Sequence, residues 1–285
     1  MPTVPDTPIA SIIVPTLTAA RYLDVTLASV MPQAAAVGAE VIIVCDGPDL
    51  ATTEVADRHG AQLISFRHQR GLNCGRNAGI KTARSDLLVF IDQDVRAPAG
   101  WLDALLAGMA AHPELEVFGG PIRAVLEGGP RGCGHEPPPI TTLDAGPEDC
   151  DVPFVWGANM AMRRSAFDRI GLFDERLRGR GDEEDWELRW RAAGGRIRYL
   201  AAAGLDHRRT AEDSRLLVLA RAAYGQGREA RRHDVRVGKA RAILRESRVL
   251  AGCTWHTVVR RCGYGIVMGA RSAGSLREAL TEHRS

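Results

Sequence analysis

Two aspartates, Asp92 and Asp94, stand one residue apart directly after the apolar stretch "LLVFI". An unbroken apolar stretch of this length predicts a buried strand, so both carboxylates come where that strand ends. At a strand end the alternation of side chains relaxes, and the two carboxylates can point into one space. Carboxylates that close repel each other, and a hard divalent cation with a phosphate-bearing ligand would relieve the repulsion. A turn with two solvated aspartates fits the pattern alone equally well.

The stretches around these aspartates alternate between strand-like and helix-like patterns. Apolar, β-branched segments predict strands, and apolar residues at helical spacing predict helices. The predicted strands are 10–16, 40–47, 61–68, 86–94 and 115–122, and the predicted helices are 20–33, 48–60, 72–85 and 98–113. This alternation indicates an α/β fold with a mostly parallel sheet covered on both faces. Ligands of such sheets gather at the carboxyl ends of the strands, where Asp46 and Asp92 both lie.

A long segment, residues 127–151, separates this part from the rest of the chain. It is rich in Gly and Pro and has little periodicity, so we expect a loop of the kind that is usually functional or disordered. The segment contains Cys133, His135 and Cys150, which raises the question of a zinc site. Their spacing matches none of the common zinc sites, so zinc is a minor alternative.

The last third of the chain is predicted to be mainly helical. Residues 182–195 predict a helix with tryptophans among charges, and residues 196–210 predict a short strand and a loop that ends near His207. From residue 211 onward we expect two or three amphipathic helices. Glycines predict breaks in these helices around Gly225–Gly227 and Gly263–Gly265.

The composition is that of an ordinary globular protein. The chain has 285 residues, of which 45% are hydrophobic and 25% are charged, and this length suits a large domain with an appendage. No apolar run approaches the ~20 residues that span a bilayer, and the start "MPTVPDTPIA" does not resemble a secretory signal. The six cysteines are scattered without a C-x-x-C pair. We therefore expect a cytoplasmic protein.

The net charge of +2 is unevenly distributed along the chain. Residues 211–285 contain 15 Lys and Arg against 7 Asp and Glu, whereas residues 1–210 contain 22 against 28. A basic helical tail can bind anionic membranes, nucleic acid or an acidic partner, or it can be a solvated helix face. The tail stretch 249–270 is apolar enough to lie on a membrane, although two arginines interrupt it, and a dimer contact or a lid fits it as well.

Six motifs occur in order between residues 9 and 210. They are "SIIVPTLTAARYL", "EVIIVCDG", "RGLNCGRNAGIKTARSDLLVFIDQDV", "GANMAMRRSAFDRIGLFDERL", "EEDWELRWRAAGGRI" and "DHRRT". Together they resemble the family 2 glycosyltransferases, which have a Rossmann-like nucleotide-diphospho-sugar transferase (GT-A) fold. The resemblance implies a catalytic domain over residues 1–210 and a basic C-terminal helical extension over residues 211–285. It also implies an inverting transfer from a nucleotide-diphosphate sugar that depends on Mn²⁺ or Mg²⁺.

The resemblance assigns a set of residues to the donor and the metal. Asp46 would bind the donor base, with Pro15 and Thr16 touching that base at the exit of the first strand. Asp92 and its neighbour Gln93 would lie at the ribose and the metal. The metal ligands would be Asp94 and His207. The "GRN" motif implies that Arg76 contacts the phosphates or supports the loop that holds them, while a structural ion pair is the plain alternative.

The resemblance also implies the catalytic base and the acceptor side. Asp185 in "EEDWEL" would take the proton of the attacking hydroxyl, and neighbouring acids would raise its pKa. Acids at a helix start can instead simply cap and solvate it. The acceptor side would comprise Trp156 as a platform, together with Gly157, Asn159 and Glu184.

The chain departs from the family pattern near the donor base, and it does not identify an acceptor. Cys45 stands where the family often has a further aspartate, Pro48 replaces a serine, and Leu17 and Thr18 replace Tyr-Asn. A UDP-sugar is the favoured donor because uridine is the commonest choice. Bacterial relatives decorate lipid-linked glycans, natural products or peptides, so a hydroxyl of such a molecule is the expected acceptor, and no nucleic acid is expected. Membrane contact at the inner face and a homodimer through the C-terminal helices are both open.

Three alternatives compete with this interpretation. A haloacid-dehalogenase-like phosphatase also has Asp-x-Asp after a strand, but it would have Thr or Val where Arg96 stands. A sugar nucleotidyltransferase would have a Gly-rich loop with Lys or Arg after the first strand, and "PTLTAARYL" lacks these glycines. An inactive binding module would be expected to lose Asp94 or Asp185, and both are present.

Overall fold

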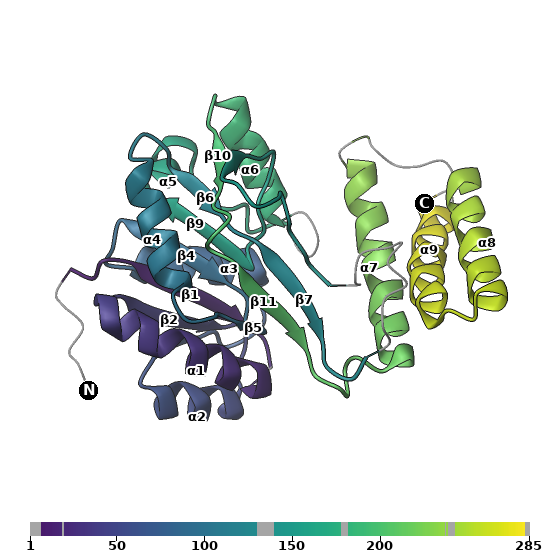
Figure 1. Ribbon diagram of the computed structural model, residues 1–285, viewed down its shortest axis with the longest axis horizontal. Helices are drawn as coiled ribbons and strands as arrows, with labels where there is room; N and C mark the ends of the chain where they lie inside the picture. Colours follow the sequence, from purple (N-terminus) through teal and green to yellow (C-terminus); the bar gives the residue numbers. More distant parts are fainter. Residues whose placement is uncertain are drawn as a thin grey trace. The chain divides into compact units, whose positions relative to one another are not determined.

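The computed structural model describes residues 7–18, 20–129, 140–177, 182–236, 238 and 243–282, so Cys133 and His135 lie outside the described residues. Packing divides the chain into two compact units, residues 1–124 with 141–207 and residues 125–140 with 208–285. Figure 1 shows that the first unit combines strands and helices and that the second is dominated by the helices α7, α8 and α9. The predicted domain boundary between residues 210 and 211 stays a prediction.

A large sheet forms the centre of the first unit. Its strands follow the order β3-β2-β1-β4-β9-β6-β10-β8. Their bounds are β1 Ser11–Thr16, β2 Glu40–Cys45, β3 Gln62–Ser65, β4 Leu87–Ile91, β6 Val117–Gly119, β8 Cys150–Asp151, β9 Asn159–Arg163 and β10 Ile197–Tyr199. The strands β3, β2, β1 and β4 are parallel neighbours, whereas β9 runs antiparallel between β4 and β6. The predicted α/β fold with a mostly parallel sheet is confirmed.

Helices cover both faces of this sheet (Figure 1). Alternate residues of β1 belong to different hydrophobic clusters, because Ile12 and Val14 pack with α1 and α4 while Ile13 packs with α3 and α6. This double burial explains why the strands are continuously apolar rather than alternating. The helix bounds are α1 Ala20–Val37, α2 Leu50–His59, α3 Leu72–Thr82, α4 Trp101–Ala111, α5 Arg164–Ile170 and α6 Asp182–Ala192.

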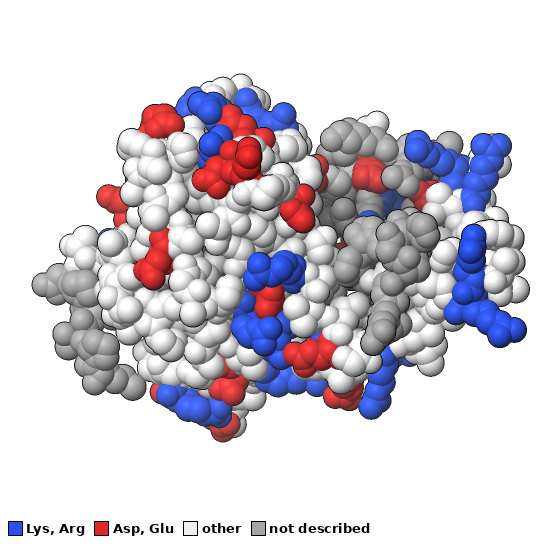
Figure 2. Space-filling model, in the orientation of Figure 1, with Lys and Arg blue, Asp and Glu red and all other residues white. Residues whose placement is uncertain are grey.

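A smaller sheet, ordered β5-β11-β7, carries one of the predicted metal ligands. Its strands are β5 Val95–Arg96, β7 Ile122–Leu126 and β11 Leu205–Arg209, and His207 pairs with Val95 in antiparallel register. The preceding residue, Asp206, accepts hydrogen bonds from Arg96 and Arg123, both at 2.9 Å. Over these strands Figure 2 shows acidic atoms surrounded by basic ones. One carboxylate therefore ties all three strands together beside His207.

The second unit is built around α7 Leu216–Arg236, α8 Ile243–Val259 and α9 Gly263–Glu282. α9 packs against both α7 and α8, and Leu219, Ala223 and Val267 form a small core between α7 and α9. In the described part of the chain, every helix is too short or too polar to cross a membrane.

Glycines allow these helices to approach closely, and one predicted break is wrong for this reason. α7 continues through Gly225–Gly227 instead of ending there. A Cβ at Gly227 would clash with the carbonyl oxygen of Arg271 in α9, and one at Gly274 would clash with that of Tyr224 in α7. The glycines thus serve helix contact rather than interruption. The other predicted break is confirmed, because α8 ends before α9 begins at Gly263.

Candidate active site

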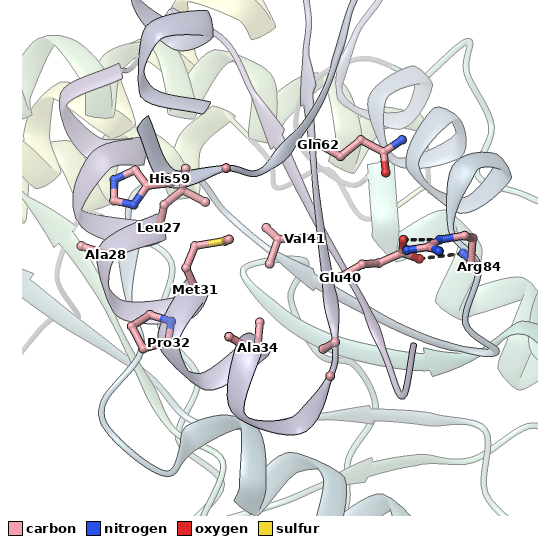
Figure 3. A pocket seen from close by; sticks show the side chains of 14 residues that line it. Leu27, Ala28, Met31, Pro32, Ala34, Glu40, Val41, His59, Gln62 and Arg84 are labelled. Carbon is pink, nitrogen blue, oxygen red and sulfur yellow. Dashed lines mark hydrogen bonds and ion pairs between the residues drawn. The ribbon is translucent and has the colours of Figure 1, made fainter. Parts of the chain in front are cut away.

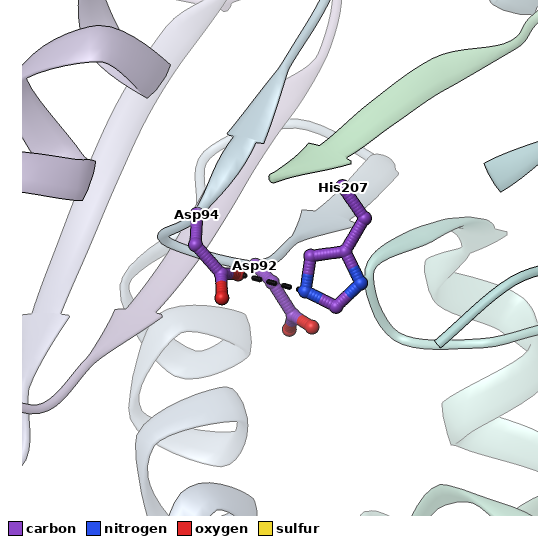
Figure 4. A group of neighbouring side chains, drawn as sticks. All are labelled: Asp92, Asp94 and His207. Atoms are coloured by element: carbon purple, nitrogen blue, oxygen red, sulfur yellow. Dashed lines mark hydrogen bonds and ion pairs between the residues drawn. The ribbon is translucent and has the colours of Figure 1, made fainter. Parts of the chain in front are cut away.

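Asp92, Asp94 and His207 converge at the carboxyl end of the central sheet (Figure 4). Each offers one ligand atom, and these atoms all lie within 4.8 Å of one another. Asp92 directly follows β4, and Asp94 directly precedes β5. His207 lies in β11, 113 positions after Asp94 in the chain. The turn at Asp92–Asp94 and the strand pairing of β5 with β11 bring the three together. Two carboxylates and an imidazole form a donor set that suits Mn²⁺ or Mg²⁺.

The ring of His207 is held in an orientation that suits a metal ligand. Its side chain is only 4% exposed, and Nδ1 lies 3.2 Å from the carbonyl oxygen of Thr141. A proton on Nδ1 that is donated to this oxygen leaves the Nε2 lone pair on the side of Asp94, whose Oδ1 is 3.1 Å away. Metal-binding histidines commonly donate their other ring nitrogen to a carbonyl or carboxylate in this way.

The charge of the cluster is only partly balanced by the protein. Burial, and then the carboxylate of Asp94, raise the pKa of Asp92 to about 6, while His207 and Arg76 act in the opposite direction. A divalent cation at this position would favour the ionised form of both carboxylates. The electrostatics therefore agree with the donor set, and the residues fit a divalent metal.

Gln93 connects this cluster to the end of β1. Its side-chain oxygen accepts hydrogen bonds from the Thr16 hydroxyl and, at 2.9 Å, from the Leu17 backbone N–H. The hydroxyl of Thr26 in α1 donates to the carbonyl oxygens of Gln93 and Val95 at 2.7 Å each. Gln93 thus fixes the turn that carries the two aspartates. Because its side-chain oxygen already accepts these hydrogen bonds, its amide nitrogen is the group that would contact a nucleotide.

Asp46 lies at the end of β2 and organises the loop that leads into α3. Its Oδ1 accepts the N–H of Arg70 at 2.6 Å, and its Oδ2 accepts that of Gly71 at 2.9 Å. Asp46 also donates its own N–H to the carbonyl oxygen of Thr16, next to Pro15. The predicted base-binding residues Pro15, Thr16 and Asp46 are therefore neighbours, and each carboxylate oxygen of Asp46 retains capacity to accept one further hydrogen bond.

Arg76 is buried inside the site rather than extended over it. Its side chain is 2% exposed, its Nη1 donates to Asn73 Oδ1 at 3.1 Å, and the same nitrogen lies 3.5 Å from Glu183 Oε2. Its guanidinium also lies over the ring of Phe173. A Cβ at Gly157 would meet this guanidinium, so a side chain there would have to displace Arg76. These contacts favour the supporting role of Arg76 over direct phosphate contact.

Helix α6 holds the loop Val155–Gly157 through two glutamates one turn apart. Glu187 Oε1 accepts the N–H of Val155 at 2.9 Å, and Glu183 Oε1 accepts that of Gly157 at 3.4 Å. Glu187 is 1% exposed, and its Oε2 is buried without a hydrogen-bond partner. Burial, reinforced by Glu183 and Glu184, raises the pKa of Glu187 well above its usual value. Glu187 therefore anchors the loop from a buried position that favours its neutral form.

Asp185, the predicted base, lies on another side of α6. Consecutive residues of a helix point about 100° apart, so Asp185 faces roughly away from Glu183 and Glu187. Its Oδ2 accepts a hydrogen bond from Arg189 Nε at 3.1 Å, and the side chain is 40% exposed. Arg189 in turn donates to the carbonyl oxygens of Ile170 and Leu172. Asp185 is partly exposed and held by an arginine, and Glu184 next to it is likewise partly buried.

The predicted acceptor-side residues fall into two groups. Trp156 is partly buried and packs on Phe154, with ring centroids 5.0 Å apart, which forms an aromatic surface beside Gly157. Asn159 is 0% exposed. Its Oδ1 accepts a hydrogen bond from Trp101 Nε1, and its Nδ2 donates to the carbonyl oxygens of Pro121 and Ala203. Asn159 thus points into the core from its position on β9, and its predicted place on the acceptor side stays a prediction.

The sequence pattern assigns no role of their own to Glu183, Glu187 or Arg189. Their spacing contained a signal, since residues four apart share one face of a helix and Glu183 and Glu187 are such a pair. Their partners in the loop Val155–Gly157, however, lie about 30 positions earlier in the chain. A local sequence pattern does not record which distant segments pack together.

A separate hollow of about 660 Å³ lies near the amino end of β2 (Figure 3). Glu40, the first residue of β2, is held there by the Ser11 hydroxyl at 2.6 Å and by Arg84 Nε at 2.9 Å. His59 in its wall is bound to Asp24. The polar groups of Glu40 and His59 are therefore already paired, and most of the remaining lining is apolar. The hollow lies at the amino end of β2, whereas nucleotides bind at the carboxyl ends of such strands.

Comparison with known proteins gives the family. The model of "Glycosyl transferase family 2" matches residues 11–171. A pre-mycofactocin glycosyltransferase of Mycobacterium tuberculosis is 31% identical over 202 residues, which are 66% of this chain and 41% of that protein. A validoxylamine A glucosyltransferase of Streptomyces hygroscopicus is 29% identical over 222 residues, covering 65% of this chain and 51% of that protein. The chain thus spans about half the length of these relatives, or less.

Solved structures agree on the fold. The structure of GalNAc-T7 with UDP, GalNAc and Mn²⁺ matches 76% of this chain and 47% of that chain, with a TM-score of 0.58 at 17% identity. The mannosyltransferase PcManGT from Pyrobaculum calidifontis, with GDP-Man and Mn²⁺, matches 96% and 74% with a TM-score of 0.58 at 15% identity. Because the family model covers more than half of the chain, this protein belongs to glycosyl transferase family 2, and its fold is the GT-A fold.

Proposed function

We propose that this protein is an inverting, metal-dependent glycosyltransferase. It moves a sugar from a nucleotide-diphosphate sugar, with a UDP-sugar favoured, to a hydroxyl of a glycan, a lipid-linked glycan or a natural product. The observation that carries the proposal is the convergence of Asp92, Asp94 and His207 beside the strand ends that bear Thr16 and Asp46. The names of the relatives, a glycosyltransferase and a glucosyltransferase, support the same reaction class.

The donor would bind along the carboxyl ends of β1, β2 and β4. Asp46 would accept a hydrogen bond from the base with a carboxylate oxygen that the N–H groups of Arg70 and Gly71 already orient. Asp92, Asp94 and His207 would hold Mn²⁺ or Mg²⁺. When bound, the metal would neutralise the charge that grows on the diphosphate as its bond to the sugar breaks. The two solved structures, one with UDP and GalNAc and one with GDP-Man, both contain Mn²⁺ and support this arrangement.

The acceptor would enter on the side of α6 and of the loop Val155–Gly157. Asp185, on a side of α6 that faces roughly away from Glu183 and Glu187, would take the proton from an attacking hydroxyl that reaches that side, and Arg189 would orient its carboxylate. Trp156 and Phe154 offer an aromatic surface against which a sugar ring can stack. Glu183 and Glu187 would fix that loop relative to α6, so that platform and base keep a constant separation.

Three alternatives lose support at particular residues. The phosphatase would have Thr or Val where Arg96 stands, and the family model that matches the chain is that of a glycosyltransferase. A nucleotidyltransferase would need a Gly-rich loop after β1, and that exit is instead fixed by Gln93. An inactive module would have no reason to keep both the cluster and an accessible Asp185.

Release of the nucleoside diphosphate tests the proposal directly. The purified protein is incubated with UDP-glucose, UDP-N-acetylglucosamine, UDP-galactose or GDP-mannose, each with Mn²⁺, Mg²⁺ or EDTA. We expect metal-dependent release from one donor, and the anomeric configuration of a product, read by proton NMR, tests inversion. Absence of both release and calorimetric binding of UDP and GDP in the presence of Mn²⁺ would sink the proposal. The acceptor is then sought with the donor that is turned over.

The C-terminal helices leave two predicted contacts open, a membrane at the inner face and a second copy of the chain. Neither contact is part of the proposed reaction at the strand ends. The surface of α8 distinguishes them by its chemistry.

A further inference from the structure

Helix α8 presents a stripe of exposed apolar residues to the solvent, with Arg248 between its two ends. Leu244, Trp255, Val258 and Val259 are 63%, 56%, 71% and 57% exposed. At 100° per residue they fall on one side of the helix. The opposite side packs on α9, where Gly265 and Gly269 lie against Cys253. The stripe is therefore the outward side of a helix that is already anchored in its own unit.

The charges on this side of α8 are all positive. Arg245 and Arg248 are exposed along the stripe, and Arg260 and Arg261 are exposed directly after the helix ends. The acid between Ile243 and Cys262, Glu246, is 9% exposed and belongs to the packed side. On the face that Figure 2 shows, the atoms over α8 include basic ones and no acidic ones. Exposed apolar residues flanked by arginines, with an exposed tryptophan, are typical of helices that lie in a membrane interface.

We propose that this side of α8, defined by Leu244, Arg245, Arg248, Trp255, Val258 and Val259, binds the surface of an anionic lipid bilayer. The apolar residues enter the boundary between headgroups and acyl chains, and the arginines pair with lipid phosphates.

A second copy of the chain fits this surface less well than a bilayer does. In a two-fold symmetric contact, the same patch would have to face itself. Arg245 and Arg248 of one copy would then approach the same arginines of the other, with no acid on either stripe to balance them. An anionic bilayer instead complements the charge and the apolar stripe at the same time.

Cosedimentation of the full chain with lipid vesicles tests the proposal. The vesicles consist of phosphatidylcholine alone or of an equal mixture of phosphatidylcholine and phosphatidylglycerol. We expect binding to the mixed vesicles, weaker binding at high salt, and little binding to phosphatidylcholine alone. Arg248→Gln should lower the partition constant about fivefold, and Val258→Asp should lower it by more than about tenfold.

Matched substitutions on α7 serve as controls. Leu217 is 78% exposed and apolar, and Arg221 is exposed and basic, so Leu217→Asp and Arg221→Gln make the same chemical changes outside the stripe. Both controls should leave vesicle binding unchanged, and circular dichroism and melting temperature check that all four variants fold.

The outcomes separate the candidate partners. Absence of binding to the mixed vesicles would overturn the proposal, and so would equal losses in the α7 and α8 variants. If light scattering finds a dimer that Val258→Asp dissociates while vesicles are not bound, the partner of this side of α8 is a second copy.

Discussion

The two groups of acidic side chains around the site differ in how their charge is balanced. In the first group, Asp92 and Asp94 face each other, and the pKa of Asp92 is raised to about 6 by burial and by its neighbour. In the α6 group, three carboxyl groups each have a partner of their own: Arg76 for Glu183, Arg189 for Asp185 and the Val155 N–H for Glu187. The first arrangement suits a cation from outside, whereas the second positions a loop and the predicted base.

The two groups thus separate acids that can bind a metal from acids that hold neighbouring parts of the protein in place. Acids that converge in one space at a strand end retain the capacity to bind a metal. Acids that point in different directions from one helix are each used by a different neighbour. Four substitutions can test this distinction.

Asp94→Ala should have the largest effect. It removes a ligand from the cluster without removing core packing, because Asp94 sits in a turn between β4 and β5. We expect metal-dependent donor turnover to fall by at least about 10²–10³-fold, measured as nucleoside diphosphate release with Mn²⁺. His207→Ala should weaken the apparent Mn²⁺ affinity less, since one neutral ligand of about six is lost. Wild-type turnover by a correctly folded Asp94→Ala protein would remove the metal assignment.

Asp185→Asn should have the next largest effect, on catalysis alone. The amide can still accept the hydrogen bond of Arg189 Nε but cannot take a proton. We expect kcat for transfer to fall by roughly 10²–10⁴-fold, while calorimetric binding of donor and metal survives.

Glu184→Gln is the matched control for this substitution. Glu184 and Asp185 point about 100° apart, so they cannot both reach the same hydroxyl. If Glu184→Gln abolishes transfer and Asp185→Asn spares it, the base is Glu184.

Asp46→Ala should raise KM for the donor by roughly 10–150-fold, which corresponds to about 1.5–3 kcal/mol for one charge-assisted hydrogen bond. The same substitution also frees the N–H groups of Arg70 and Gly71, so calorimetry of UDP binding is the decisive measurement. Asp49→Ala is the control, because Asp49 caps α2 three residues later and touches no predicted donor group. Equal UDP affinity in wild type and Asp46→Ala would place the base elsewhere.

Glu187→Gln should have the smallest effect, and it concerns stability. Because the folded-state pKa of Glu187 is raised above 4.5, its contribution is intact below about pH 4.5 and is lost as the pH rises toward the folded pKa. The Gln variant is neutral throughout, so its melting temperature should exceed that of the wild type near about pH 8, with about 2–4 °C for each kcal/mol recovered. The difference should vanish toward pH 4.5.

The control for this last substitution is again Glu184→Gln. Glu184 is less buried, so neutralising it should not reproduce the pH-dependent gain. A Glu187→Gln protein that is less stable than the wild type at every pH would show that Glu187 is ionised in the folded state.

The sequence by itself determined the strands and the aspartates at their ends. "EVIIVCD" and "LLVFID" each combine a continuous apolar run with an acid directly after it, and both properties are local. A parallel strand is buried on both faces, so its apolar residues follow one another without interruption. An acid directly after such a strand marks the point where the chain leaves the core. The α/β fold and the position of Asp46, Asp92 and Asp94 follow from this.

Only the tertiary structure decided which distant residues meet there. His207 lies 113 positions from Asp94, and strand pairing of β11 with β5 brings them together. Packing also turned Asn159 into the core, divided the α6 acids among three partners, and used Gly227 for a helix contact where the sequence predicted a break. Residue type sets what a side chain can do. Its neighbours are set by contacts between segments far apart in the chain, which no local pattern records.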